Sequence, residues 1–443
     1  MSKPLSKKLW KPEFRHRCEF PAPPIEEIEA RLQAVLTPGS FAPLRMADQR
    51  NKLRERVLTL PVMTAIVVSL VFRKMPSLAE VLRVLSSEGL LWVEALRVSK
   101  QALSQRLESL PSSLFGRVFQ DVISRQNERA CAPLCPDPEQ TGNQGIVDRF
   151  GAVWIADGST LEALKRKLGS LKEEAAVVLG GKMMMLVSAF SHRPVFAWYT
   201  DDAKANDKSW TEALLSHLPE GGLLIFDLGF FSFLWFDAFT EAKKFFVTRL
   251  RQKTAFRILQ VLSQGPCFSD AIIELGQYRS NPCKHRVRLV SALFKGTWYY
   301  YLTNVLDPRH LSAKQVCELY RRRWRIEQAF LLTKRLLGLE YLWVGGKNGV
   351  EIQVYATWIF YAVLTDLCQQ VANALSQPLE RISVEMVFRG LYHFSRAVQR
   401  GAATCVAAYL SANAKLLGLV KAVRKRHRQL QSEQQDLWEP TLT

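Results

Sequence analysis

The chain has 443 residues, 48% of them apolar and 23% charged, a composition typical of a folded globular protein with a sizeable core. Sixty lysines and arginines against 41 acidic residues leave a net charge of +19, which indicates a polyanionic partner, with nucleic acid first and an anionic membrane surface second. The longest apolar run, Leu60–Phe72, is far shorter than the about 20 residues of a bilayer span, and the basic N-terminus lacks the apolar stretch of a secretory signal, so we expect an intracellular protein.

The first third of the chain has helical periodicity, from Ile25 to about Arg129. Ser99 is placed as the N-cap of a helix that exposes Lys100 and Arg106. This pattern resembles the second helix of a helix-turn-helix, whose polar side chains read DNA. An amphipathic bundle helix with a solvated polar face explains it equally well. We predict that residues 1–145 form an N-terminal helical DNA-binding domain, ending in a linker rich in proline and glycine.

After the linker the apolar period changes to that of strands alternating with helices, which predicts a mixed sheet flanked by helices, an α/β fold. A hairpin across Lys295-Gly296 indicates a β-rich insertion over residues 256–310. The insertion divides the predicted core into a first part, residues 146–255, and a second part, residues 311–375. C-terminal helices and a basic tail are expected over residues 376–443. The strands expected in the core are Ala152–Asp157, Lys182–Phe190, Pro194–Thr200, Leu223–Asp227 and Lys244–Leu250.

Two aspartates follow apolar strand sequences. Asp157 ends VWIAD and precedes GST, and Asp227 ends LLIFD and precedes LGF. Sites in open α/β sheets form beyond the carboxyl ends of strands, and the nearby glycines allow a tight turn and a close ligand approach. Either aspartate alone is more often a turn former or a helix N-cap.

A basic helix supplies the third acid. On a wheel of about 100° per residue, Tyr320, Arg323, Glu327 and Lys334 share one narrow stripe, and the neighbouring arginines lie on another face. An exposed i,i+4 ion pair between Arg323 and Glu327 is the simpler explanation of the helix by itself. Together with Asp157 and Asp227, however, Glu327 completes a three-carboxylate set that can bind two Mg²⁺ ions, with Mn²⁺ as a substitute, for in-line phosphoryl displacement.

The spacing Tyr320-(2)-Arg323-(3)-Glu327-(6)-Lys334 resembles the Tyr-Arg-Glu-Lys signature of bacterial insertion-sequence transposases of the insertion-sequence-four family. The surrounding sequence also resembles that family, with four segments in the family's order: DGST, FDLGFFS, FFVTRLR and YRRRWRIEQAFLLTKRLLGLE. The likeness covers roughly residues 25–375. One position departs from it, because some relatives have arginine directly after the second aspartate, where this chain has Leu228 and then Gly229.

The resemblance implies a ribonuclease-H-like core interrupted by the β-rich insertion. It also implies cut-and-paste DNA transposition in the bacterial cytoplasm, at the nucleoid, by a dimer or higher assembly on double-stranded inverted-repeat ends and target DNA. The implied acidic triad is Asp157, Asp227 and Glu327. By the same resemblance, Tyr320, Arg323 and Lys334 contact terminal phosphates.

Trp298 in the insertion is a further candidate, because an aromatic ring beside a basic cleft can stack on a base swung out of the duplex. Packing within the tyrosine-rich β strand is the favoured alternative for this residue. At the level of the whole protein, two alternatives to a transposase remain. One is a transposase-derived DNA-binding protein without strand-transfer activity, and the other is a structure-selective nuclease on the same core.

Overall fold

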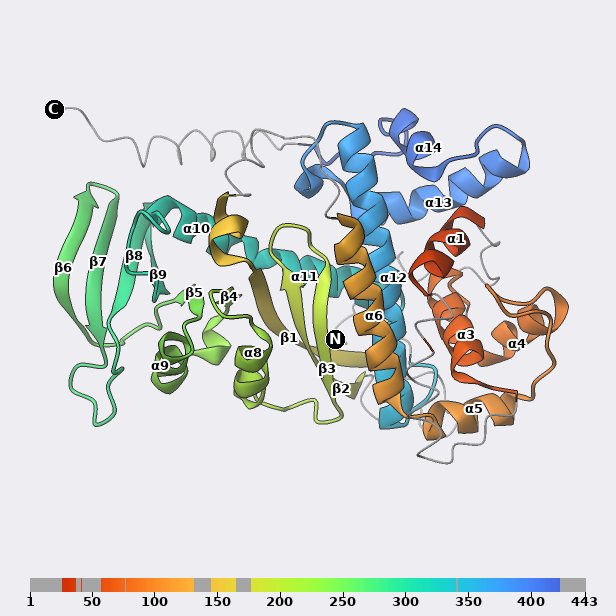
Figure 1. Cartoon of the computed structure of the whole chain (residues 1–443), viewed down its shortest axis with the longest axis horizontal. Coiled ribbons are helices and arrows are strands. Elements are labelled where there is room, and N and C mark those ends of the chain that lie inside the picture. The colour runs from red at the N-terminus through yellow and green to blue at the C-terminus, as the bar shows by residue number, and fades with distance from the viewer. Residues whose placement is uncertain are drawn as a thin grey trace, which may run out of the picture.

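The computed structural model describes residues 26–36, 41, 57–75, 77–130, 145–164, 177–339 and 342–422. Most of the predicted linker and most of the basic C-terminal tail lie outside the described residues. Within them, the fold is mixed α/β, built on one nine-stranded sheet (Figure 1). The strands are β1 (Val153–Leu164), β2 (Val177–Ser188), β3 (Pro194–Thr200), β4 (Leu223–Phe226), β5 (Phe245–Arg249), β6 (Phe256–Gly265), β7 (Phe268–Leu275), β8 (Val287–Phe294) and β9 (Thr297–Thr303).

The strand order across the sheet is β3-β2-β1-β4-β5-β9-β8-β7-β6. β1, β2 and β3 form an antiparallel meander, while β4 and β5 run parallel to β1. β4 has the sequence LLIF and all four of its side chains are buried, as expected for a central strand covered on both faces. The predicted mixed sheet is therefore confirmed.

The strands of the predicted β-rich insertion belong to the same sheet as the core strands. β9 pairs antiparallel with β5, and β8, β7 and β6 follow it outward, so the insertion extends the core sheet (Figure 1). A fully buried ion pair holds this extension in register. Arg288 on β8 donates to both carboxylate oxygens of Asp270 on β7, at 2.7 and 2.6 Å. The same guanidinium donates to the Leu311 carbonyl at 2.6 Å, just before the next helix begins.

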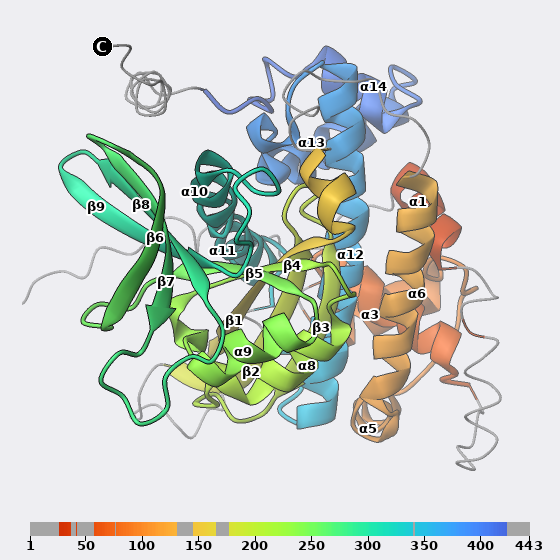
Figure 2. The ribbon, with the colours of Figure 1, turned by 60° about the vertical axis from the view of Figure 1, so that its left-hand side comes forward.

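Helices cover both faces of the sheet (Figure 2). On one face lie α8 (Thr211–His217) and α9 (Phe233–Glu241), whose apolar side chains join Ala156, Leu224 and Phe226 in one core cluster. On the other face, Ile155 and Val247 belong to a second, larger cluster that includes the later helices. The helices of this second face are α10 (Ala313–Arg322), α11 (Trp324–Leu331) and α12 (Lys347–Ala374).

The larger cluster continues through α12 into the N- and C-terminal helices. α12 is apolar around most of its circumference and is buried along most of its 28 residues. A helix that is apolar on all sides is typical of a protein interior. It packs against α3, α5, α6, α13 and α14 (Figure 1). None of the helices in the described part of the chain is long and apolar enough to span a membrane. The helices around α12 are α1 (Glu26–Val35), α3 (Leu60–Phe72), α4 (Leu78–Ser87), α5 (Lys100–Ser109), α6 (Ser112–Ala130), α13 (Val384–Gln399) and α14 (Val406–Ala412).

Candidate active site

Sheet register brings the two aspartates side by side. The parallel pairing of β1 with β4 ends at Ala156 opposite Phe226, so Asp157 and Asp227 are the next residues of their segments. β4 ends there, as predicted. β1 does not end at Asp157, however, because it continues to pair with β2 as far as Leu164. The sequence showed where the apolar run stops but not that a neighbouring strand extends the ladder.

The basic helix lies across this edge of the sheet with the predicted stripe facing the aspartates. A capping box starts α10, with Ser312 accepting from the Gln315 backbone and Gln315 from the Ser312 backbone. The Tyr320 hydroxyl donates to Asp227 Oδ1 at 2.9 Å. Arg323 donates to Glu327 Oε1 at 2.8 Å, one helical turn further on.

Arg323 contacts all three predicted acids. Its guanidinium donates to Asp157 Oδ2 at 3.2 Å and to Glu327 at 2.8 Å, and its Nε lies 4.0 Å from Asp227 Oδ1. The residue is only 5% exposed. The i,i+4 ion pair with Glu327 therefore exists, but it is not an isolated pair on a solvated helix face. Instead, one buried cation joins three carboxylates that are 70 and 100 positions apart in the chain.

Burial is the largest single influence on the pKa values of Asp157, Tyr320 and Arg323. It raises the pKa of Asp157 from 3.8 to about 7, although the Arg323 charge and the Gly158 N–H oppose the shift. Burial, together with the nearby Asp227 charge, also raises the pKa of the Tyr320 phenol, which therefore stays a hydrogen-bond donor. Burial lowers the pKa of Arg323, but the surrounding carboxylates outweigh that effect and the net pKa is raised.

The donor set suits a hard cation, because it consists of carboxylate oxygens and needs no sulfur or imidazole. Among the described residues, no group of three or more His, Cys, Asp or Glu side chains is already placed to hold a metal ion. The guanidinium of Arg323 lies among the three carboxylates instead. A divalent ion fits the chemistry of Asp157, Asp227 and Glu327 if Arg323 turns away from them.

Lys334 lies after α11, where the backbone changes from α-helical to π-helical. Residues Leu332–Leu336 form a π-helical turn, a local widening that often marks functional sites. The Lys334 ammonium donates to the Thr160 carbonyl at 2.5 Å, three residues after Asp157 on β1. The structure therefore brings Lys334 to the strand that carries the first aspartate.

Trp298 is placed differently. The residue is 40% exposed. It is therefore not buried by packing among the neighbouring tyrosines, which was the favoured alternative to a DNA contact. Along β9, Tyr301 faces the site, because its ring lies 5.3 Å from the Tyr320 ring. Side chains alternate along a strand, so Trp298 points to the opposite face of the sheet. Tyr299 shares the site's face and lies 5.8 Å from the Arg249 guanidinium.

Arg249 and Tyr299 were not predicted as site residues. Arg249 ends β5, directly opposite Tyr301 on β9, and its Nε is buried without a hydrogen-bond partner among the described residues. The sequence contained a signal for Arg249, since it lies in the FFVTRLR motif. For Tyr299 the adjacent aromatic residues gave no way to choose between the two faces of the strand.

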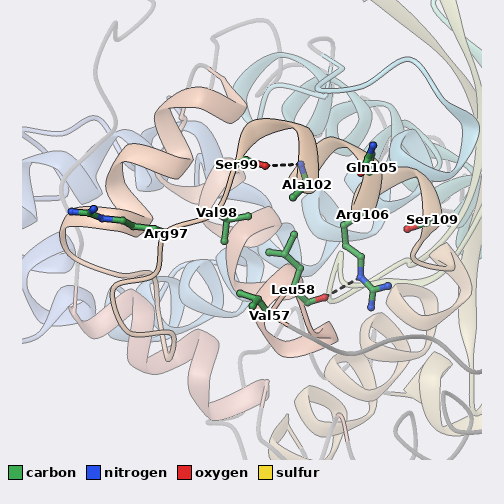
Figure 3. Close-up of a pocket in the computed structure, with 9 residues that line it drawn as sticks. All are labelled: Val57, Leu58, Arg97, Val98, Ser99, Ala102, Gln105, Arg106 and Ser109. Carbon is green, nitrogen blue, oxygen red and sulfur yellow. Dashed lines mark hydrogen bonds between the residues drawn. The ribbon is translucent and has the colours of Figure 1, made fainter.

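The predicted DNA-reading helix exists as α5, and Ser99 caps it by accepting from the Ala102 backbone at 3.1 Å. Lys100 is exposed. Arg106 is not freely exposed as predicted, because its Nε donates to the Leu58 carbonyl at 2.9 Å across an open pocket of about 440 Å³ (Figure 3). The connection from α4 to α5, Glu88–Ser99, is also much longer than the about three- to four-residue turn of a helix-turn-helix.

Known proteins resemble the middle of the chain. Residues 151–362 match the transposase DDE domain model. A Sinorhizobium fredii protein named "Putative transposase y4zB" is 28% identical over 224 residues, which are 48% of this chain and 60% of that protein. A Geobacillus stearothermophilus protein named "Probable transposase for insertion sequence element IS5377" is 26% identical over 175 residues, 38% of this chain and 45% of that protein. The chain thus spans about half the length of these relatives.

Among solved structures, the cryo-EM structure of a piggyBac transposase synaptic complex with hairpin DNA aligns over 89% of this chain and 86% of that one. Its identity is 13% and its TM-score is 0.34, which is too low to support a shared fold. The domain match is more informative, because it contains every candidate residue from Asp157 to Lys334. Lys100 and Arg106 lie outside the matched range.

Proposed function

We propose that this protein is a DNA transposase that cleaves phosphodiester bonds at the inverted-repeat ends of a mobile element and transfers the freed 3′ ends to target DNA. The observation that supports it most is the placement of Arg323, which joins Asp157, Asp227 and Glu327 at one edge of the sheet. A helical ion pair that served only stability would not need two further carboxylates from separate strands. The match of residues 151–362 to the transposase DDE domain supports the same function.

The finer assignment follows the sequence signature. We assign the chain to the insertion-sequence-four family and its core to the ribonuclease-H-like class. The antiparallel β1–β3 meander followed by parallel β4 and β5, with helices on both faces, supports that class. The acting form is a dimer or higher assembly on double-stranded element ends and target DNA, at the nucleoid in the bacterial cytoplasm.

The proposed roles of the residues follow from their positions. Asp157, Asp227 and Glu327 hold two divalent ions, Mg²⁺ or Mn²⁺. When bound, such a pair activates the attacking oxygen and stabilises the leaving oxygen of an in-line displacement. Three flanking side chains, Tyr320, Arg323 and Lys334, bind and orient the terminal phosphates, because they are donors on the same edge as the carboxylates. Trp298 and Lys100 remain proposed DNA contacts away from this cluster, and Arg106 supports α5 beside Lys100.

A cleavage assay tests the function directly. Duplexes that carry the inverted repeats flanking the gene are incubated with the full chain, in Mg²⁺ or in EDTA, alongside scrambled duplexes. We expect Mg²⁺-dependent nicking at the repeat ends, followed by transfer to a supercoiled plasmid. Tight repeat-specific binding with no nicking in Mg²⁺ or Mn²⁺ would instead identify a transposase-derived binding protein. Nicking that ignores the repeat sequence would identify a structure-selective nuclease.

A further inference from the structure

The two aspartates have little backbone pairing to hold them together. The β1–β4 ladder ends at Ala156 and Phe226, one residue before Asp157 and Asp227. On the α11 face, Arg323 contacts both aspartates. On the opposite face, the backbone that follows each aspartate is approached by Asp207, the first residue of the 3-10 helix η2 (Asp207–Trp210).

Two glycines show how closely Asp207 approaches the site. Gly158 directly follows Asp157, and a Cβ added to it would overlap Asp207 Oδ1. Gly229 lies two residues after Asp227, and its Cβ would come within 3.1 Å of Asp207 Oδ2. The Asp207 carboxylate therefore lies against both backbone segments that follow the aspartates. These glycines leave room for Asp207, whereas the sequence suggested that they leave room for a ligand.

Lys182 on β2 holds the Asp207 carboxylate in place. The Lys182 Nζ lies 2.6 Å from Asp207 Oδ1 and donates to the Ala205 carbonyl at 2.9 Å. The Lys182 and Asp207 side chains are only 13% and 26% exposed, and the ammonium also lies over the Trp210 ring. A partly buried pair with several partners has a defined geometry, unlike a mobile surface pair.

We propose that Asp207, fixed by Lys182, is a positioning residue that sets the separation of Asp157 and Asp227. The proposal rests on the proposed transposase function. Gly158 N donates to Asp157 Oδ1 at 2.9 Å, so a shift of the Gly158 backbone moves the Asp157 carboxylate. Gly229 lies in the short 3-10 turn (η3, Leu228–Phe230) that begins directly after Asp227, whose carbonyl accepts from the Phe230 N–H at 3.1 Å. One carboxylate therefore links the two aspartates across the gap that the ladder leaves open.

The test compares Asp207→Ala, which removes the contact, with Asp207→Asn, which keeps the shape of the side chain and an oxygen beside the Lys182 ammonium. Asp201→Ala is the matched control, because Asp201 lies in the same connection and forms an exposed ion pair with Lys347. Mn²⁺ binding to the DNA-free protein is followed by electron paramagnetic resonance. Nicking of a repeat-end duplex is measured over a range of Mg²⁺ concentrations, with repeat binding and thermal unfolding measured in parallel.

For Asp207→Ala we expect repeat binding to be retained, Mn²⁺ affinity to fall and the nicking rate to fall on the order of tenfold or more, since small misplacements are costly. Asp207→Asn should restore most of both, and Asp201→Ala should resemble the wild type. Wild-type Mn²⁺ affinity and nicking in a folded Asp207→Ala protein would overturn the positioning role. An Asp207→Asn protein as defective as Asp207→Ala would overturn it too. A wild-type protein that neither binds Mn²⁺ nor nicks would refute the proposed function itself.

Discussion

At the scale of single residues, the site is organised around Arg323. A guanidinium that is almost fully buried is stable only with compensating negative charge, and here Asp157 and Glu327 accept from it directly while Asp227 lies 4.0 Å away. The converse also holds, because three adjacent carboxylates repel one another without a cation between them. Arg323 thus balances negative charge at the position where we propose that divalent ions bind.

Replacing Glu327 by glutamine separates a metal ligand from a helix ion pair. The change keeps the size of the side chain and removes the charge that holds a divalent ion. We expect repeat-end binding to persist or tighten, because a negative charge near phosphate is gone, and Mg²⁺-dependent nicking to be lost. Binding is measured by fluorescence anisotropy and nicking on labelled duplexes.

The ion-pair explanation makes a different forecast for the same variant. Glu327→Gln and Arg323→Ala would then behave alike, each costing about 0.2–0.5 kcal/mol of helix stability with nearly normal nicking. Robust cleavage by a well-folded Glu327→Gln protein would contradict the acidic triad.

Asp157→Asn should change stability in a pH-dependent way. The folded protein raises the pKa of Asp157 from 3.8 to about 7, so between these values the folded state keeps a proton that the unfolded chain has released. The free energy of unfolding of the wild type therefore falls as pH rises through this range, and above pH 7 the whole penalty is present. A shift of about three units corresponds to at most about 4 kcal/mol.

In EDTA, Asp157→Asn should accordingly exceed the wild type in stability above pH 7 and lose this advantage near pH 4. Urea unfolding followed at several pH values measures the difference. An advantage that is independent of pH would show that the side chain is not protonated in the folded protein near pH 6.

Sequence alone predicts those parts of the site that depend on local geometry. Tyr320, Arg323 and Glu327 share a stripe because the helical period fixes it. Contacts that depend on how distant segments meet were not predictable. Asp207 approaches Gly158 only because η2 packs against the face of the sheet opposite α11. Arg106 similarly reaches a carbonyl that lies 48 positions earlier.

At the scale of elements, the insertion helps to place α10, the helix that leads into α11 and Glu327. Arg288 joins β8 to β7 through Asp270 and also donates to the Leu311 carbonyl, two residues before α10 begins. The insertion and the start of α10 are therefore tied by one buried side chain. Arg288 donates to Asp270, Val305 and Leu311, which lie 18, 17 and 23 positions from it, so no local pattern indicated these contacts.

Asp270→Ala should be strongly destabilising, because it leaves the fully buried Arg288 charge without its acid. We expect a loss of roughly 3–5 kcal/mol in the free energy of unfolding, measured by urea denaturation. The double variant Asp270→Leu/Arg288→Met should be more stable than Asp270→Ala. The control is Glu274→Ala, which breaks the exposed Arg257–Glu274 pair on the same sheet and should cost less than about 1 kcal/mol. Equal losses in Asp270→Ala and Glu274→Ala would contradict the tie.

Two residues of α5 allow DNA recognition to be tested separately from structural stability. Lys100→Ala should leave the thermal unfolding midpoint nearly unchanged and weaken binding to repeat ends, because Lys100 is exposed and has no supporting role in the described structure. Arg106→Ala should lower stability by about 1.5–3 kcal/mol, because the Leu58 carbonyl loses a charged donor. Unchanged end selectivity in Lys100→Ala would move recognition away from this helix.

At the scale of the whole molecule, one apolar cluster runs from Ile28 through the sheet and α12 to Leu419. The N-terminal helices therefore pack on the same interior as the face of the sheet that carries the carboxylates. DNA held by α5 and DNA held at the carboxylates would thus contact one continuous framework. The division of the chain into five segments stays a prediction.

The net charge of +19 makes salt dependence the broadest test of DNA binding. Each phosphate neutralised by lysine or arginine releases counterions, so a protein with about 6–10 phosphate contacts loses about 10³–10⁵ in affinity between 50 and 200 mM salt. We expect a loss of that order for duplex repeat ends, measured by anisotropy titrations at several salt concentrations. Lys100→Ala should reduce the slope of log affinity against log salt by about one, because it removes one such contact. Glu327→Gln should not reduce the slope, since it removes no positive charge. An affinity that changes less than about tenfold across this range would mean that the lysines and arginines do not bind the phosphate backbone. The net charge would then indicate a polyanionic partner other than duplex DNA.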